Sequence, residues 1–371
     1  MTSTFPRWEG DATPRFVRDL ALAATRGSTP WDVTVLAPHH HGALVRETMG
    51  PLDVRRFRYF PSRFERLAYD GGILPNLRAS WLARVEVAPF FVAMAHAMRR
   101  LVTEIEPDLV HAHFVVPQGI VGAFGRTPLL LSAHGSDVLA LRGTMGARLR
   151  RVAFERARVV TANSRAMEVA LAGEGVSRKV RSLPMGIDVA KLRPSGEKRT
   201  GPLLFVGRLS PQKGVHVLLD AIARARRPLV VIGDGPERDA LRERARDLPV
   251  TFAGGLSEDA VAEAYRTAAA VIVPSVEGEA QGLVALEAMA AGAPVIVTRT
   301  GGLVETVDES RGWLAEPGDV RSLANVIDEA SRQETEATRR ATAARDWVVA
   351  HRSWEAIDPR LHAIYTEATW G

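Results

Sequence analysis

Residues 274–290 read PSVEGEAQGLVALEAMA, which predicts the end of a strand, a glycine-containing loop and the start of a helix. Glu279 lies in the loop, and Glu287 lies eight positions later in the second turn of the helix. A carboxylate near the start of such a helix can accept hydrogen bonds from two vicinal hydroxyls, as a ribose presents them. Compensation of the helix dipole is the alternative role for Glu287, but it leaves the glycine-rich loop unexplained. We therefore favour a ligand-binding site at this loop.

A second loop of this kind lies upstream, where GRLSPQKG at residues 207–214 follows a predicted strand and precedes a predicted helix. In parallel sheets, ligands bind beyond the carboxyl ends of the strands, where helix N-termini present free amides to anions. Arg208 can bind two phosphate oxygens at once, and Lys213 supplies a compact positive charge. A lysine is unusual here, because only four of the 48 basic residues are lysines. A solvated turn with two surface cations is the alternative.

Two further loops place candidate residues at strand ends. His134 follows the predicted strand 129–133 and precedes a glycine, so it is better placed to contact a ligand than a core histidine. Gly10 precedes the first predicted helix, and Gly301-Gly302 follow another predicted strand. Glycines at these places let the backbone approach a ligand closely.

Three other features are discounted. Adjacent histidines at 39–41 point to opposite faces of an extended chain, so they do not form a metal site. Gly233-Asp234-Gly235 is only part of a dinucleotide fingerprint, because Arg238 occupies the third glycine position. No Asp-x-Asp pair is present to hold a metal bound to a nucleotide diphosphate. We expect no cofactor and no metal.

The loops fit a wider pattern in which short β-branched runs alternate with helical patterns, as in parallel α/β sheets. In the first half, strands are predicted at 32–36, 54–59, 108–112, 129–133, 159–162 and 180–183, and residues 1–4 leave room for only a very short opening strand. In the second half, strands are predicted at 203–206, 229–232, 250–253, 270–273 and 295–298. The main helices are predicted at 14–25, 77–103, 164–171 and 353–371.

These two sets predict two domains, since 371 residues are too many for one ordinary core. We expect an N-terminal domain at 1–187, a polar linker at 188–201, a C-terminal domain at 202–350 and a terminal helix at 351–371. The sequence has no cysteine, which excludes disulfides and thiolate chemistry and fits a reducing cytoplasm. No apolar run is long enough to span a bilayer, and no signal-peptide pattern is present.

Charge is unevenly distributed within the net value of +5. Residues 1–190 hold 25 Lys and Arg against 17 Asp and Glu, whereas the remainder holds 23 against 26. An arginine-rich composition explains this without nucleic acid, which we do not expect as a partner. Five arginines lie within a dozen residues, and three aromatic residues follow in a helical stretch: Arg55, Arg56, Arg58, Arg63, Arg66, Trp81, Phe90 and Phe91. One hypothesis is therefore peripheral contact with the inner face of a membrane.

Taken together, the motifs resemble the family-4 retaining glycosyltransferases of the GT-B fold. The resemblance rests on segments in the family's order: 134–137, 162–164, 184–188, 207–214, 233–236, 274–275, 279–287, 292–295 and 301–302. Three positions depart from it: Ala280-Gln281 stand where Gly-Phe is frequent, Met185 where asparagine is common, and Gly10-Asp11 where Gly-Gly is frequent. The fold implied is two Rossmann-like domains facing across a cleft, with the terminal helix crossing back onto the N-terminal domain.

The resemblance also implies roles for the candidate residues. Arg208 and Lys213 would hold the donor diphosphate and stabilise it as the leaving group. Glu287 would bind the ribose, Glu279 the donor sugar, and His134 the same sugar near its C6 side. Donor contacts are further implied for Gly10, Asp137, Gly207, Gly282 and Leu283.

The implied reaction is metal-independent transfer of a hexosyl unit, with retention, from a nucleoside diphosphate sugar to an acceptor hydroxyl. A UDP-sugar is the favoured donor and GDP-mannose the next. The acceptor is a small molecule, a glycan or a lipid-linked sugar. The alternatives are a nucleotide-sugar epimerase or a glycoside phosphorylase on the same scaffold, and a sugar-nucleotide-binding module without activity.

Overall fold

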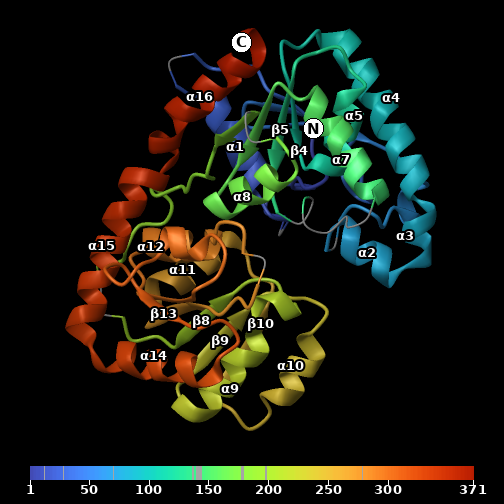
Figure 1. The fold of residues 1–371 in the computed structure, drawn as a ribbon. Coiled ribbons are helices and arrows are strands. Elements are labelled where there is room, and N and C mark those ends of the chain that lie inside the picture. Colours follow the sequence, from blue (N-terminus) through green and yellow to red (C-terminus); the bar gives the residue numbers. More distant parts are fainter. Residues whose placement is uncertain are drawn as a thin grey trace. The chain divides into compact units, whose positions relative to one another are not determined.

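The structure is a computed structural model of the 371 residues. It describes residues 1–11, 13–27, 29–69, 71–135, 138, 144–176, 179–196, 199–277 and 279–371. The chain forms two compact units (Figure 1). Unit 1 comprises Met1–Leu183 and Asp358–Gly371, and unit 2 comprises Pro184–Ile357. Residues 188–201, which we expected to be a linker, therefore belong to unit 2.

Unit 2 is built on a six-stranded sheet in the order β10-β9-β8-β11-β12-β13, in which every pairing is parallel. Its strands are β8 (Leu203–Val206), β9 (Leu229–Ile232), β10 (Val250–Gly254), β11 (Ala270–Val273), β12 (Val295–Thr298) and β13 (Trp313–Ala315). The first five lie where the β-branched runs predict them. The prediction omitted β13, because a strand of three residues is too short to show an alternating pattern.

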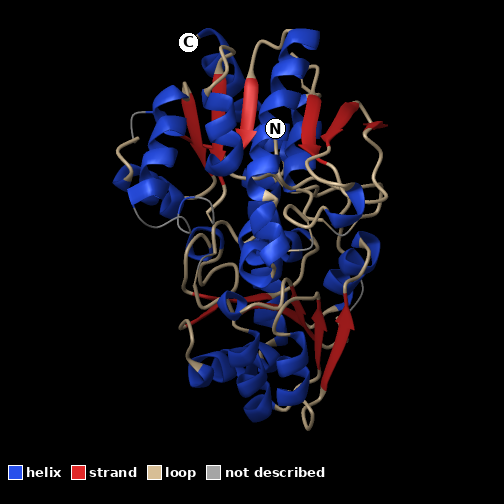
Figure 2. Ribbon diagram, turned by 90° about the vertical axis from the view of Figure 1, so that its right-hand side faces the viewer, coloured by secondary structure: helices blue, strands red, loops and turns tan. Residues whose placement is uncertain are grey.

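Side chains alternate along these strands between two cores, one on each face of the sheet. Phe205 of β8 packs into one core, and Leu204 packs into the other. The first core is covered by α9 (Val215–Ala225), α10 (Arg238–Arg244) and α14 (Val320–Arg332). The second is covered by α11 (Glu258–Thr267), α12 (Leu283–Ala290), α13 (Leu303–Thr306) and α15 (Glu334–Arg352). Figure 2 shows strands with helices packed beside them in each unit.

The strand order places the candidate loops together. From β8 the chain continues outward through β9 and β10 on one side, and it returns to the other side of β8 with β11. In open parallel sheets, ligands bind outside the carboxyl ends of the strands at such a reversal of order. The loops that follow β8 and β11 therefore meet at the expected binding position.

Unit 1 holds two smaller sheets. One is parallel, in the order β4-β5-β6-β7, and the other has the order β1-β3-β2, with β2 antiparallel to β3. The strands are β1 (Thr34–Pro38), β2 (Arg46–Met49), β3 (Leu52–Phe57), β4 (Val110–His113), β5 (Leu129–Ala133), β6 (Val159–Ala162) and β7 (Val180–Ser182). Met1 and Thr2 hydrogen-bond to β4 and β1, respectively. The prediction omitted β2, whose sequence Arg-Glu-Thr-Met is mainly polar.

The helices of unit 1 differ from prediction in one place. They are α1 (Phe16–Ala24), α2 (Ile73–Ala79), α3 (Trp81–Val85), α4 (Val87–Ile105), α5 (Ile120–Ala123), α7 (Thr144–Arg156) and α8 (Arg165–Gly173). The single helix predicted over 77–103 is wrong, because Ser80 has an extended backbone and caps α3 by accepting a hydrogen bond from the Ala83 amide. Glu86 between α3 and α4 keeps helical dihedral angles, so these two helices follow one another directly.

The last helix, α16 (Trp354–Trp370), begins in unit 2, and its residues from Asp358 onward belong to unit 1. The Tyr365 hydroxyl lies 2.9 Å from Nδ1 of His111 in β4. Arg158 donates a hydrogen bond to the Thr369 carbonyl, and Arg181 forms an ion pair with Glu367. Each of these contacts lies within unit 1. No helix in the described ranges is both long and apolar enough to span a bilayer.

Candidate functional site

The loops after β8 and β11 meet through their backbones. Gly214 ends the first loop with φ of 67°, and a Cβ there would lie 2.0 Å from the Pro274 carbonyl oxygen. The Val276 amide donates a hydrogen bond of 2.9 Å to the Gln212 carbonyl. Glycine is required at position 214, since any side chain would force the two loops apart.

The loop after β9 supports the start of the first loop in the same way. A Cβ on Gly233 would lie 1.9 Å from the carbonyl oxygen of Gly207, and Leu209 donates a hydrogen bond of 2.9 Å to the Asp234 carbonyl. Arg208 lies between these fixed points and is half-buried. Gly233 and Asp234 therefore help to position the Arg208 loop, although they belong to no dinucleotide fingerprint.

Lys213 and Glu279, predicted from separate loops, form an ion pair. Lys213 Nζ lies 2.6 Å from Oε2 of Glu279, and the Ser275 hydroxyl donates to the same oxygen at 2.9 Å. The Glu279 side chain is largely buried, whereas that of Lys213 is one-third exposed. Such a pair is held more firmly than a surface salt bridge, because a second hydrogen bond fixes the carboxylate.

The backbone at Glu279 is fixed by the loop after β12. The Gly302 amide donates a hydrogen bond of 2.9 Å to the Glu279 carbonyl, and a Cβ on Gly301 would lie 2.0 Å from the same oxygen. Gly282 has φ of 78° and caps the N-terminus of α12, whose first residue is the half-buried Leu283. The glycine pair predicted as a ligand-approach loop thus has a supporting role at Glu279.

Glu287 lies in the second turn of α12 and is half-buried. Its Oε2 accepts a hydrogen bond of 2.9 Å from the hydroxyl of Tyr265 in α11. Burial, together with the Glu287 carboxylate, raises the pKa of Tyr265 well above its usual value. The tyrosine is therefore a hydrogen-bond donor that orients Glu287 across the physiological pH range.

The remaining candidate residues, His134, Asp137 and Gly10, belong to unit 1. His134 follows β5, and its Nε2 lies 3.1 Å from Nδ1 of His113, with the two rings stacked. Phe16 and Phe114 also flank its ring. Burial lowers the pKa of His134 to about 3, so the imidazole is neutral at physiological pH. Asp137, the other donor-contact candidate of this loop, lies outside the described residues.

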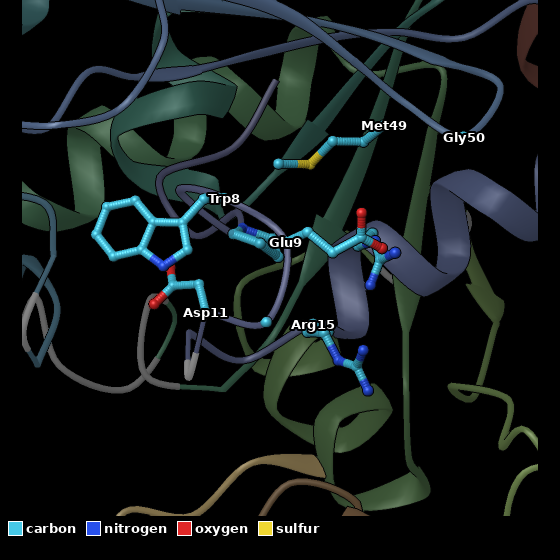
Figure 3. Close-up of a pocket in the computed structure, with 9 residues that line it drawn as sticks. Trp8, Glu9, Asp11, Arg15, Met49 and Gly50 are labelled. Carbon is cyan, nitrogen blue, oxygen red and sulfur yellow. The ribbon is translucent and has the colours of Figure 1, made fainter. Parts of the chain in front are cut away.

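Gly10 lies on a small surface pocket of unit 1, which Figure 3 shows with Trp8, Glu9, Asp11, Arg15, Met49 and Gly50 around it. Its φ is 81°, and apart from Gly10 itself and its two chain neighbours, no described atom lies within 4 Å of the position that a Cβ would take. The neighbouring Asp11 is buried and accepts hydrogen bonds from Arg7 and Thr13. Burial would raise the pKa of Asp11, but these hydrogen bonds lower it to about 2. Asp11 is therefore an anion that holds the loop, while Gly10 faces the solvent.

The cluster of arginines upstream of α2 is only partly a basic surface. Arg56 is buried and donates to the Pro6 carbonyl, and Arg55 pairs with Asp53 and Glu104. Arg58, Arg63 and Arg66 are exposed, as predicted.

The three aromatic residues also differ in their exposure. Phe90 is fully buried in the core and Phe91 is half-buried, so the hypothesis that both face a membrane is wrong. Trp81 is 74% exposed.

Four residues that position the site were not singled out from the sequence. They are Tyr265, Ser275, Gln281 and His113, and each contacts a candidate residue or its loop. Two of them carried a signal in the sequence: Ser275 as part of a segment shared with the family, and Gln281 as a departure from the family's usual Gly-Phe. In the part of the chain that is described, no cluster of three or more His, Asp or Glu side chains is arranged to hold a metal ion.

Comparison with known proteins gives the same assignment for both halves of the chain. A family model for "Glycosyltransferase Family 4" matches residues 14–191, and one for "Glycosyl transferases group 1" matches residues 190–347. A glycogen synthase of Mycobacterium tuberculosis is 30% identical over 315 residues, which cover 76% of this chain and 76% of that protein.

Two further similarities extend over most of the chain. A GDP-mannose-dependent alpha-(1-6)-phosphatidylinositol monomannoside mannosyltransferase of the same organism is 28% identical over 298 residues, or 71% of this chain and 77% of that protein. The structure of sucrose-phosphate synthase from Thermosynechococcus elongatus superposes with a TM-score of 0.79 at 25% identity, covering 95% of this chain and 92% of that one.

Proposed function

The chain belongs to the family-4 glycosyltransferases of the GT-B fold, and on that premise we propose that it is a retaining, metal-independent hexosyltransferase. Its donor is a nucleoside diphosphate sugar, with a UDP-sugar favoured and GDP-mannose next. Its acceptor supplies a hydroxyl group. The observation that carries the proposal is the meeting of the Lys213 and Glu279 loops at the strand-order reversal of unit 2.

The chemistry follows from the charges at this position. A departing nucleoside diphosphate gains negative charge on its β-phosphate, and cations already in place there lower the barrier without reorganisation. Lys213 and Arg208 are the two basic side chains on the loop after β8, so they are the groups we assign to that charge. Glu279 would bind hydroxyls of the donor sugar, and Glu287 would bind the ribose.

Retention is proposed without a covalent intermediate. The Glu279 carboxylate already accepts hydrogen bonds from Lys213 and Ser275, which weakens it as a nucleophile. A front-face route needs no protein nucleophile, because a leaving phosphate oxygen takes the proton of the acceptor hydroxyl on the same face of the sugar. The new glycosidic bond then forms as the bond to the phosphate breaks.

The proposal for the acceptor rests on one related protein and on one exposed surface of this chain. The mannosyltransferase relative acts on a phosphatidylinositol mannoside, according to its name. On α3 and α4 of this chain, Trp81, Val85 and Val92 are 74%, 52% and 70% exposed and share one side of the helices. We propose that this side, termed the apolar stripe, contacts an anionic membrane that carries the acceptor.

Exposed basic residues close to the stripe in the sequence favour such a membrane. Arg78 and Arg84 are both exposed, and Arg63 lies over the ring of the exposed Phe64. The only carboxylates of the described residues 58–69 and 71–100 are Glu65 and Glu86, and both are buried. Exposed apolar groups between cations are typical of helices that lie in the interface of an anionic bilayer.

The reaction is tested by ligand binding and then by turnover. A thermal-shift screen across UDP, GDP, ADP and their sugars identifies the donor, since a ligand that binds the folded state raises its apparent stability. The product linkage formed from that donor, observed by NMR, reports whether the anomeric configuration is retained. Transfer should continue in excess EDTA. Activity that disappears in EDTA and returns only with Mg²⁺ or Mn²⁺ would contradict the metal-independent proposal.

Three outcomes would favour the alternatives. Interconversion of the donor sugar without an acceptor would indicate an epimerase, and phosphorolysis of a glycoside would indicate a phosphorylase. Binding of the sugar nucleotide with neither transfer nor slow hydrolysis would leave a binding module.

A further inference from the structure

Gln281 connects the donor loop to the first residues of unit 2. Its side-chain Nε2 donates a hydrogen bond of 3.0 Å to the Met185 carbonyl, and its Oε1 accepts one of 2.8 Å from the Met185 amide. The glutamine is 5% exposed, so neither hydrogen bond competes with bulk water. Both polar ends of one buried side chain are therefore used to hold one backbone position.

The backbone of Gln281 is fixed from the other side. Thr306 of α13 donates a hydrogen bond of 3.3 Å to the Gln281 carbonyl. Gln281 lies two residues after Glu279 and directly before Gly282, which caps α12. A displacement of the Glu279 loop would therefore move the Gln281 side chain and the two hydrogen bonds that it makes.

Met185 lies where the chain enters unit 2, since the boundary falls between Leu183 and Pro184. This entry segment, residues 184–187, is also bound to the segment through which the chain leaves unit 2. Ile187 forms a β-bridge with Ser353, and a Cβ on Gly186 would lie 2.5 Å from the Trp354 ring. Both segments that connect the units are thus packed together, and Gln281 is hydrogen-bonded to one of them.

We infer that Gln281 is a positioning residue through which the occupied donor loop constrains the two connecting segments. This inference rests on the proposed function, because it takes the Glu279 loop as the sugar-nucleotide site. A ligand acts on a distant segment only through interactions that differ between the free and bound states. Lys213 and Glu279 supply that difference, since a diphosphate competes for Lys213 and a sugar for Glu279. The loop then transmits the change to Met185.

The experiment follows amide hydrogen exchange in peptides covering residues 180–190, with and without UDP and GDP, while calorimetry measures nucleotide affinity. In the wild type, the nucleotide that binds should slow exchange in this segment. In Gln281→Met, which removes both hydrogen bonds at nearly constant volume, exchange should be faster and should no longer respond to bound nucleotide. Gln281→Glu keeps an acceptor for the Met185 amide and should restore part of the response.

Thr306→Val is the matched control. It removes a hydrogen bond to the Gln281 carbonyl in the same loop and one to the Gly302 carbonyl in the loop after β12, but it leaves the contacts with Met185 intact. Its nucleotide response should match that of the wild type even if its stability falls. In hydrolysis of the donor, Gln281→Met should lower kcat about tenfold or more with little change in KM, because misplaced groups act in the transition state.

The outcomes separate the two proposals. If the wild type binds nucleotide and Gln281→Met still shows the full exchange response, the coupling is wrong and the proposed function stands. An equal loss of response in Thr306→Val would also overturn the coupling, since a general loosening of the loop would explain both variants. Absence of binding by every nucleoside diphosphate tested would overturn the proposed function and this inference with it.

Discussion

Lys213 and Glu279 are each other's partners in this structure, although each also has a predicted ligand group. Their contact of 2.6 Å leaves the lysine less available to an anion than an isolated cation would be. A diphosphate carries more negative charge than one carboxylate, so it can displace Glu279 from Lys213. The displaced carboxylate would then be available to the donor sugar. If Lys213 and Glu279 have these roles, we expect the diphosphate of the donor to engage Lys213 before its sugar engages Glu279.

The first prediction concerns the cations of this loop. Arg208→Ala and Lys213→Ala should each lower kcat/KM, with a loss of transition-state stabilisation of about 2–4 kcal/mol. The reason is that each variant removes a positive charge that would stabilise the leaving group. Lys191→Ala is the control, since Lys191 pairs with Glu258 at the surface. Steady-state kinetics with saturating acceptor checks this. Wild-type kcat/KM in both loop variants would exclude the loop from the active site.

The second prediction separates the two glutamates by their affinity for bare nucleoside diphosphate. Glu287→Gln should weaken that affinity about tenfold, as the loss of one hydrogen bond to a charged group does. Glu279→Gln should bind at least as tightly as the wild type, because Lys213 loses a competing carboxylate, and yet it should transfer poorly. Calorimetry and turnover measure the two effects. Equal weakening of nucleotide binding in both variants would show that the roles are not separate.

For individual residues, the sequence predicted which of them lie in loops at strand ends better than it predicted which residues they contact. Glu279, Glu287 and Lys213 were singled out because strand ends and glycine loops are typical of places where ligands bind. The pairing of Lys213 with Glu279 spans 66 positions and depends on strand order, which no local pattern contains. Tyr265 was not found for the same reason, since its hydroxyl meets Glu287 from another helix.

Among the elements, buried parallel strands were the best predicted, because uninterrupted β-branched runs have few other interpretations. The helix predicted over 77–103 shows the limit of periodicity. Its apolar positions continue through α2, α3 and α4, so hydrophobicity alone does not show that the backbone extends at Ser80. Periodicity also cannot distinguish a buried stripe from an exposed one. The two apolar faces of α3–α4, with Phe90 inside and Val92 outside, became distinct only in the structure.

The third prediction tests that exposed face. The full chain should co-sediment with vesicles containing phosphatidylglycerol and much less with pure phosphatidylcholine, and salt should weaken the binding. Trp81→Glu with Val92→Glu should reduce binding about tenfold or more, because two apolar side chains that would insert into the bilayer interface are replaced by negative charges. Arg78→Glu with Arg84→Glu should act chiefly on the anionic vesicles.

Two controls keep this prediction specific. Phe124→Glu changes an apolar residue of unit 1 that is also 70% exposed, and Arg148→Glu changes an exposed arginine of α7. Both should bind vesicles as the wild type does. If the stripe instead joined two copies of the chain, ultracentrifugation would show a wild-type dimer that Trp81→Glu with Val92→Glu dissociates, and vesicle binding would be absent.

For the whole molecule, the two units differ in their charged and titratable residues. Unit 1 holds most of the excess arginine and a row of neutral histidines, and unit 2 holds the loops proposed for the diphosphate. Composition predicted the charge difference and the presence of two domains. It did not predict that the segment expected as a linker belongs to unit 2. There, Arg199 donates hydrogen bonds to the Tyr265 and Ala291 carbonyls.

The fourth prediction is that acid weakens unit 1 while nucleotide strengthens unit 2. Burial lowers the pKa of His111, His113 and His134 below the ordinary histidine value. A base whose folded pKa is lowered stabilises the fold above its unfolded pKa, and this stability is lost as the pH falls towards the folded pKa. Below about pH 6.5, each such histidine should therefore lower the free energy of unfolding by up to about 1.4 kcal/mol per pH unit.

Hydrogen exchange resolved by unit measures both effects in one experiment. Lowering the pH from about 7 to about 5.5, with exchange rates corrected for intrinsic chemistry, should reduce protection in β4 and β5 more than in β8 and β11. His113→Asn, which removes one proton site, should lessen this pH response. The nucleoside diphosphate found by thermal shift should raise protection in unit 2. Equal acid sensitivity of the two sheets, unchanged by His113→Asn, would show that the buried histidines do not govern the stability of unit 1.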